Sequence, residues 1–278
     1  MVADLHGFTE QYKKLFDAIL VHKPEAVFMA GDLLPAGSVY GRKQSENFLK
    51  AYLIPALKKL KADLKDEYPT IFVILGNDDP RCEEAHLNHA QALGLIEYVH
   101  NKVVEWKGFY VMGMSYIPPS PFLLKDWERY DVSRYVDPGC THPMEGYRTV
   151  KPVEDIHYFT IEENLEALNQ DIDAEKLICL FHTPPYQSNL DRADLDGQMI
   201  DYVPLDVHIG SIAIQRFFQK VQPLLGLHGH VHESSDLTGS WQDTINKTNL
   251  YSAAWDGQEL ALIIFNPDNP ADAIRKLM

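Results

Sequence analysis

The chain has 278 residues, 45% of them hydrophobic and 11% aromatic, which is typical of a compact globular protein and long enough for a full core. Its 40 acidic and 25 basic side chains give a net charge of −15, which repels polyphosphate backbones and disfavours a nucleic-acid polymer, and with it nuclease activity. No run approaches the roughly 20 apolar residues of a membrane helix and no secretory signal is visible, so we expect a cytoplasmic protein without a membrane partner.

The first third of the chain alternates apolar strands with amphipathic helices. Only three residues precede Asp4, so either the chain begins late or its first strand is a stub. The expected elements are then a helix with Thr9 as N-cap, a strand at 26–30, a loop at 35–41, a helix at 44–66 and a strand at 70–75. This order predicts βαβ units of an α/β fold, whose ligands gather at the carboxyl ends of strands.

The rest of the chain continues this alternation after one long interruption. We expect a helix at 82–93, strands at 103–106 and 109–114, a helix at 162–169, a strand at 177–181, a helix capped by Ser211, a strand after Pro223, and a terminal hairpin of 249–255 with 259–265.

The interruption at 116–157 is rich in proline and aromatic residues and has neither a helical nor a strand period. Long irregular segments inside a domain are usually functional or mobile, so we expect an insertion or cap that shapes substrate access rather than the core. No linker or internal repeat is visible, and residues 1–278 are therefore expected to form a single domain.

Seven polar side chains follow the ends of apolar strands, namely Asp4, His6, Asp32, Asn77, His182, His230 and His232. The i, i+2 spacing of Asp4 with His6, and of His230 with His232, places both members of each pair on one face of an extended backbone. Each residue alone has a plain structural explanation, such as turn chemistry for Asn77. Together, mixed nitrogen and oxygen donors suit two cations such as Mn, Fe or Zn that share one carboxylate. The three cysteines are too scattered for a thiolate site.

These blocks, in this order, carry a resemblance to a known family. They are D-x-H at Asp4, G-D at Gly31, G-N-x-D at Gly76, a lone histidine at His182 and G-H-x-H at Gly229. The sequence resembles a calcineurin-like metallophosphoesterase over nearly its whole length, and within that family it is similar to predicted phosphoesterases related to bacterial cyclic-nucleotide phosphodiesterases. The resemblance implies a four-layer sandwich of two mixed β-sheets flanked by helices.

The resemblance also implies a ligand set and a mechanism. One metal ion would be bound by Asp4, His6, Asp32 and His232, and the other by Asp32, Asn77, His182 and His230, with Asp32 bridging. The implied chemistry is in-line attack on phosphorus by a water or hydroxide held between two metal ions roughly 3.5 to 4 Å apart.

Asp78 stands where the family's G-N-H-D/E motif has a histidine that supports the leaving group or a phosphoryl oxygen. A carboxylate there repels a dianionic monoester more than a monoanionic diester, so we expect Asp78 to act in catalysis and to favour phosphodiesters. The alternative is that Asp78 caps the turn before Pro80 and faces away from substrate. His208, beside a predicted helix N-terminus, is a candidate phosphate ligand, whereas His228 alternates away from the metal face and is expected to be structural.

The expected function is therefore metal-dependent hydrolysis of a small phosphate ester. The alternative is a non-catalytic, metal-binding protein-interaction module of the same fold, which the acidic surface and the segment at 116–157 would also suit. Scaffolds tolerate the loss of metal ligands, and here all seven are present, which favours the hydrolase.

Overall fold

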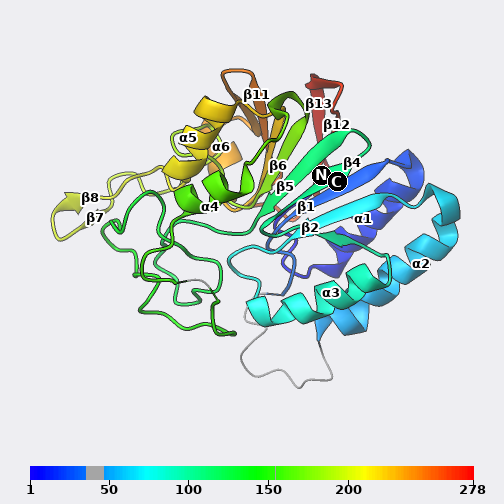
Figure 1. Ribbon diagram of the computed structural model, residues 1–278, viewed down its shortest axis with the longest axis horizontal. Coiled ribbons are helices and arrows are strands. Elements are labelled where there is room, and N and C mark those ends of the chain that lie inside the picture. Colours follow the sequence, from blue (N-terminus) through cyan, green and yellow to red (C-terminus); the bar gives the residue numbers. More distant parts are fainter. Residues whose placement is uncertain (36–46, 154) are drawn as a thin grey trace.

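The structure is a computed structural model that describes residues 1–35, 47–153 and 155–278. Two β-sheets pack face to face, and helices cover their outer faces on both sides (Figure 1). This is the predicted four-layer arrangement of two sheets flanked by helices, so the predicted fold class is confirmed. Among the described residues, no helix has both the length and the hydrophobicity that crossing a membrane requires.

The first sheet is built on three parallel strands, β1 (Ala26–Ala30), β2 (Thr70–Ile74) and β3 (Glu97–Tyr98). Its outer face is covered by α1 (Thr9–His22), α2 (Ile54–Leu64) and α3 (Glu84–Ala92). Strands β1 and β2 are continuous apolar runs because both of their faces are buried, one under helices and one against the second sheet.

The second sheet has six strands in the order β10-β11-β9-β6-β5-β4. They are β4 (Lys102–Trp106), β5 (Phe109–Met114), β6 (Leu177–Phe181), β9 (Leu225–His228), β10 (Gln242–Ile245) and β11 (Thr248–Ser252). The helices α4 (Ile161–Leu168), α5 (Ile212–Val221) and α6 (Ser234–Thr238) lie on its side of the molecule (Figure 1). As predicted, the Ser211 side chain caps α5, accepting a 3.1 Å hydrogen bond from Ile214 N.

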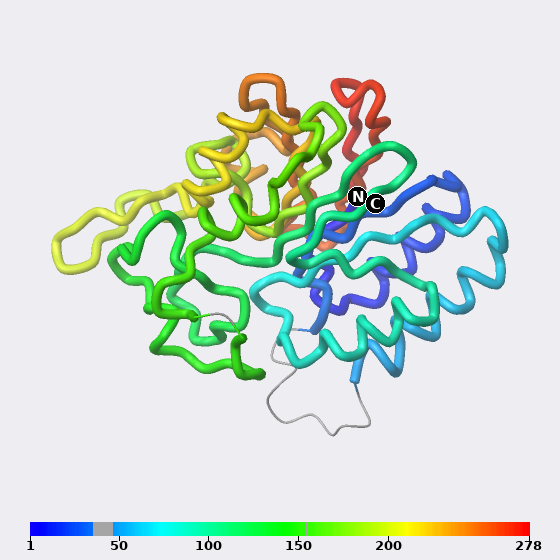
Figure 2. Tube along the Cα trace, viewed as in Figure 1, coloured from blue at the N-terminus to red at the C-terminus, as the bar shows by residue number. Residues whose placement is uncertain are grey.

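The N-terminal stub joins the first sheet to a separate two-stranded sheet near the end of the chain. Met1 O accepts a 3.0 Å hydrogen bond from Ile263 N, and Val2 N donates 2.9 Å to Phe28 O. Met1 and Val2 therefore lie between β1 and the hairpin of β12 (Ala261–Asn266) with β13 (Asn269–Leu277). The two chain ends lie close together as a result, as Figure 2 shows.

The predicted terminal hairpin of 249–255 with 259–265 is wrong. Strand β11 pairs instead with β10 and, in parallel, with β9, while β12 pairs with β13. The Asp256-Gly257 turn signal belongs to the connection between β11 of the six-stranded sheet and β12 of the two-stranded sheet. The buried side of β11 faces the other sheet, and the turn of its own hairpin lies at Asn246, where φ is 53°.

Two smaller differences concern helix ends. Thr9 is not the N-cap of α1 but its first residue, because Phe8 occupies the cap position and its carbonyl accepts from Tyr12 N. The predicted helix at 44–66 is represented by a π-helical turn at Leu49–Leu53, α2, and a short 3₁₀ turn at Lys65–Glu67. The beginning of that helix, and all but the first residue of the predicted loop at 35–41, lie outside the described residues.

The segment at 116–157 has no helix and no strand longer than an isolated bridge among its described residues. Its first part nevertheless enters the core, because Tyr116 and Trp127 are fully buried and pack in the larger hydrophobic cluster. The expectation that this segment avoids the core is therefore wrong for these residues. Ladder bonds such as Ile117 N to Trp127 O, 3.0 Å, satisfy the backbone and make that burial possible without regular structure.

Candidate metal centre

The seven predicted side chains meet at the carboxyl ends of the strands, where both sheets direct their polar turns to one place. We call Asp4, His6, Asp32 and His232 the outer group, and Asp32, Asn77, His182 and His230 the inner group. The donor atoms of the four outer side chains all lie within 4.8 Å of one another, and so do those of Asp32, His182 and His230. Asn77 joins the inner group through its Oδ1, which is 3.0 Å from His182 Nε2.

The backbone at these positions is not extended. Asp4, His6, Asp32 and His230 have φ values of 54°, 40°, 50° and 80°, in the left-handed region that non-glycine residues avoid. Such positions cost about 1–3 kcal/mol each and persist only where the surrounding structure enforces them. Here Asp4 N and His6 N donate 2.9 Å hydrogen bonds to Gly31 O and Asp32 O. The pairs spaced i, i+2 therefore converge through tight turns, and the extended-strand geometry assumed from the sequence is wrong.

Three glycines leave room for the donor side chains. A Cβ on Gly31 would lie 2.5 Å from His182 Nδ1, and one on Gly229 would lie 2.6 Å from Asp4 Oδ2. A Cβ on Gly76 would lie 2.6 Å from His182 Cε1 and would collide with Asp32 Oδ1. The glycines of the motifs are thus needed for the close approach of backbone and donors.

The inner group is held by a buried network. His182 Nδ1 is 2.7 Å from Ala30 O, and its Nε2 is 3.3 Å from Asp32 Oδ2. Burial lowers the pKa of His182, but the Asp32 carboxylate outweighs it and raises the pKa to about 9. Burial likewise raises the pKa of Asp32, yet His182 holds it well below its usual range. A metal ion bound here would take the place of the proton on His182, because only the neutral imidazole coordinates a metal.

The outer group is more open and less completely hydrogen-bonded. His6 Nε2 and His232 Nε2 face each other at 3.3 Å, and His232 Nε2 lies 3.5 Å from Asp4 Oδ1. Burial lowers the pKa of His232, but the hydrogen bond to Asp4 outweighs it and raises the pKa to about 9. His230 N donates to both Asp4 oxygens, at 3.1 and 3.2 Å, which ties the two groups together.

The donor set fits two divalent cations. His6 Nδ1 is buried and has no hydrogen-bond partner among the described residues. No lysine or arginine of the described chain pairs with the buried carboxylates Asp4 and Asp32. Buried carboxylates need a cationic partner, and imidazole with carboxylate and amide oxygens is the donor mixture that Mn, Fe and Zn accept.

Asp78 and Asp79 are adjacent in the chain but occupy different environments. Asp79 is fully buried and accepts hydrogen bonds from Leu33 N, Leu34 N and Gly76 N at 2.7–3.0 Å, so it is the residue that closes this turn. The Asp78 side chain is 40% exposed, and its Oδ2 lies 3.8 Å from His6 Nδ1. Burial and then Asp32 raise the pKa of Asp78, against the neighbouring imidazoles. Asp78 thus borders the metal centre, and turn capping is the work of Asp79.

The structure does not bring His208 into either group. Its Nδ1 lies 2.8 Å from Asp191 Oδ1, on the loop that precedes α5. His228 is fully buried, and its Nδ1 lies 3.0 Å from the carbonyls of Phe181 and Thr183, in agreement with the predicted structural role. Sequence reasoning overlooked Asp191, because a lone aspartate in a loop carries no signal that separates it from ordinary turn chemistry. Asp79 is the last residue of the G-N-x-D block, but its role in closing the turn was not predicted.

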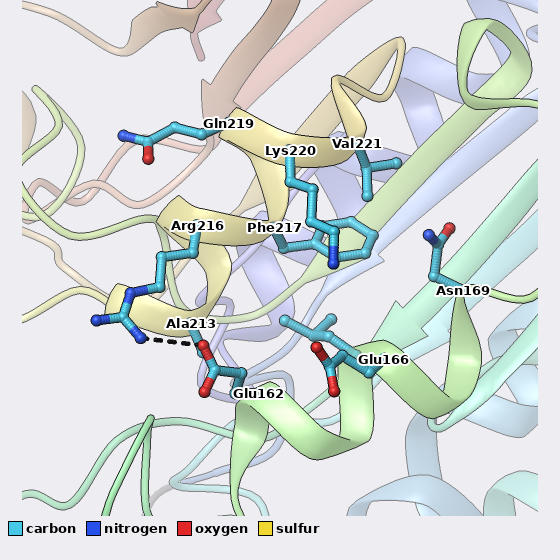
Figure 3. A pocket seen from close by; sticks show the side chains of 10 residues that line it. Glu162, Glu166, Asn169, Ala213, Arg216, Phe217, Gln219, Lys220 and Val221 are labelled. Carbon is cyan, nitrogen blue, oxygen red and sulfur yellow. Dashed lines mark hydrogen bonds and ion pairs between the residues drawn. The ribbon is translucent and has the colours of Figure 1, made fainter.

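A pocket of about 600 Å³ lies between α4 and α5 (Figure 3). Leu165 and Phe217 are among the residues that line it, and an ion pair of 3.0 Å joins Glu162 and Arg216 on its wall. No donor of the inner or outer group lines this pocket. The metal centre is therefore a separate site.

Two stacked sheets with a carboxylate and imidazole cluster at their strand ends define an α/β protein with a candidate metal centre. The sequence matches the calcineurin-like phosphoesterase family over residues 1–234. The chain belongs to this family, as its motifs predicted, and membership makes it a metal-dependent phosphoric ester hydrolase.

Solved structures agree with this fold. One crystal structure aligns with a TM-score of 0.60 and 17% identity over 99% of this chain and 96% of that chain. The crystal structure of TT1561 of Thermus thermophilus aligns with a TM-score of 0.57 and 15% identity over 99% of this chain and 96% of that chain. At such identities the likeness shows the fold alone. No curated protein matches the sequence.

Proposed function

We propose that this protein hydrolyses a small phosphodiester at a centre of two divalent transition-metal ions, Mn, Fe or Zn. The observation that carries the proposal is the division of seven donors into two groups that share the Asp32 carboxylate. A single Mn, Fe or Zn ion does not use seven donors, whereas two such ions that share one carboxylate use all of them.

Each donor has a defined part in this proposal. Asp4, His6 and His232 would hold the outer ion, Asn77, His182 and His230 would hold the inner ion, and Asp32 would bind both. When bound, two such cations lower the pKa of a water ligand and neutralise phosphoryl oxygens. The side chains already stand close together, so catalysis rests mainly on positioning and charge stabilisation.

Asp78 supports the preference for diesters. Its carboxylate lies beside His6 at the open edge of the centre, where bound cations favour its ionised form. Each unit of like charge at about 4 Å costs up to roughly 4 kcal/mol at an effective dielectric near 20. A monoester carries nearly one charge more than a diester at neutral pH, so Asp78 disfavours monoesters.

A metal and substrate screen tests the proposal. The protein is freed of metal, reloaded with Mn, Fe or Zn, and assayed with bis(p-nitrophenyl) phosphate and p-nitrophenyl phosphate. We expect metal-dependent turnover that is faster with the diester. A protein that binds two ions and hydrolyses neither ester is instead the non-catalytic interaction module. The cytoplasmic location and the lack of nucleic-acid and membrane partners stay predictions from composition and charge.

A further inference from the structure

A buried carboxylate outside the metal centre is aimed at an imidazole. Asp191 is fully buried and accepts hydrogen bonds from Gln187 N, Ser188 N and Gly210 N at 2.9–3.1 Å. Its Oδ1 also lies 2.8 Å from His208 Nδ1. Burial raises the pKa of Asp191, and His208 with the backbone N–H groups of Gly210 and Gln187 opposes that shift. Three backbone hydrogen bonds thus fix the position of the Asp191 carboxylate independently of His208.

His208 is oriented on several sides while one ring nitrogen stays available. Its backbone N donates 2.9 Å to Asp206 Oδ1, and the Tyr186 ring packs edge-on against the imidazole at 5.9 Å. The side chain is 28% exposed. With Nδ1 directed to Asp191, Nε2 has no hydrogen bond to any described residue and is not a buried nitrogen. The ring therefore presents Nε2 to solvent or to a ligand.

The position of this pair is set by the segments that leave the metal centre. Ser211 N donates 2.9 Å to Pro184 O, two residues after His182. Arg192 N donates 3.1 Å to Ser234 Oγ, two residues after His232. An isolated bridge between Arg192 and His208 closes the base of the finger that carries β7 (Met199–Ile200) and β8 (Val203–Pro204), which projects from the body in Figure 1. The segments that carry the pair are thus hydrogen-bonded to residues two positions beyond His182 and His232.

We propose that His208, positioned by Asp191, protonates the leaving group of the phosphodiester. This inference rests on the proposed function. The oxygen of a water molecule forms the new bond to phosphorus, and the bond from phosphorus to the leaving alcohol oxygen breaks. That oxygen keeps the electron pair and takes the proton from His208 Nε2, and the proton released by the attacking water restores the imidazolium.

The leaving group decides how much this proton matters, and that dependence is the test. Methyl p-nitrophenyl phosphate and methyl phenyl phosphate carry the same charge, but only the second has a leaving group that needs protonation. We expect His208→Gln to lower kcat for the phenyl ester about 100-fold and for the p-nitrophenyl ester much less. Asp191→Asn should change the ratio in the same direction by a smaller factor, because Asp191 acts through His208.

Metal content and thermal unfolding are measured for each variant, and His22→Gln on the exposed end of α1 is the matched control. His208→Gln leaves the three backbone bonds of Asp191 intact, so it reports on the proposal even where Asp191→Asn does not fold. An equal loss on both esters, or no loss, in a folded His208→Gln protein with full metal content overturns the inference. A wild-type protein that hydrolyses neither ester with any metal overturns the proposed function itself.

Discussion

The inner and outer groups of the metal centre share Asp32 but differ in how they are held. The side chains of His182 and Asp32 are 0% and 3% exposed, whereas those of His6 and His232 are 14% and 31% exposed. The second ring nitrogen of His182 is directed at Ala30 O, while Nδ1 of His6 has no hydrogen-bond partner among the described residues. Partners beyond the donors fix ring orientation and strengthen binding. The inner site is therefore prebuilt, and the outer ion should exchange more readily.

The difference extends to the supports of each group. The turn that carries Asn77 is closed by Asp79, whose carbonyl accepts a 2.6 Å hydrogen bond from Trp127 Nε1. Arg81 N, just after this turn, donates 2.8 Å to Asp126 Oδ2. The segment at 116–157 is thus hydrogen-bonded to the turn that carries Asn77 of the inner group. We expect perturbations of that segment to reach the inner ion before the outer one.

Removing the shared carboxylate should have the largest effect. Asp32→Ala deletes a donor from both groups and leaves His182 without its charged partner, so both ions should be lost together. The expected fall in metal affinity exceeds the 10–100-fold that is typical for the loss of a residue behind the donors. Metal-to-protein ratios measured after gel filtration test this, with Asp66→Ala on an exposed turn as the control. Unchanged stoichiometry would show that Asp32 does not bridge.

A substitution of Trp127 removes a contact between the segment at 116–157 and the turn closed by Asp79. Trp127→Ala should destabilise the fold by about 3–5 kcal/mol, because it empties a fully buried site and leaves Asp79 O without its donor. Trp127→Phe keeps most of the packing and should cost nearer 1 kcal/mol. Denaturant unfolding without metal measures both variants. If Trp127→Ala unfolds like the wild type, the segment is a cap that the fold does not need.

Two glycines allow the inner and outer groups to be disturbed separately. Gly31→Ala places a methyl group against His182, and Gly229→Ala places one against Asp4. We expect the first variant to weaken mainly the inner ion and the second mainly the outer ion, as judged by metal titration. Gly108→Ala, where the new Cβ meets nothing within 4 Å, should bind both ions and lose only the roughly 1–2 kcal/mol of its left-handed backbone. Equal losses in the two site variants would argue against separable groups.

The smallest expected effect is a change in the preference for diesters over monoesters when Asp78, beside the outer group, is replaced. Asp78→His removes a negative charge beside His6, so monoester turnover should rise relative to diester turnover. The ratio is measured on p-nitrophenyl mono- and diesters at matched metal occupancy. Asp79→Asn serves as the contrast, because it should lower stability without moving the ratio. A ratio that Asp78→His leaves unchanged means that Asp78 does not face the substrate.

The sequence alone determined the alternation of strands and helices and the seven polar residues at strand ends. Both are local signals, since an apolar run followed by a glycine and a polar residue marks a strand end wherever it pairs. The carboxyl ends of neighbouring parallel strands meet at one edge of a sheet, so residues such as Asp32 and Asn77 were expected to meet. The helix N-cap at Ser211 was also predicted from the sequence, because capping depends on a few adjacent residues.

Only the tertiary structure decided which strands pair and which polar groups are buried. Strand β11 pairs with β9 rather than with the strand that follows it, because partners are chosen by packing across the whole sheet. Asp78 and Asp79 are adjacent aspartates of one turn, yet Asp78 borders the metal centre and Asp79 closes the turn with a buried carboxylate. The burial of Trp127 and the contact of Asp191 with His208 join residues whose sequence spacing has no period, so no local pattern records them.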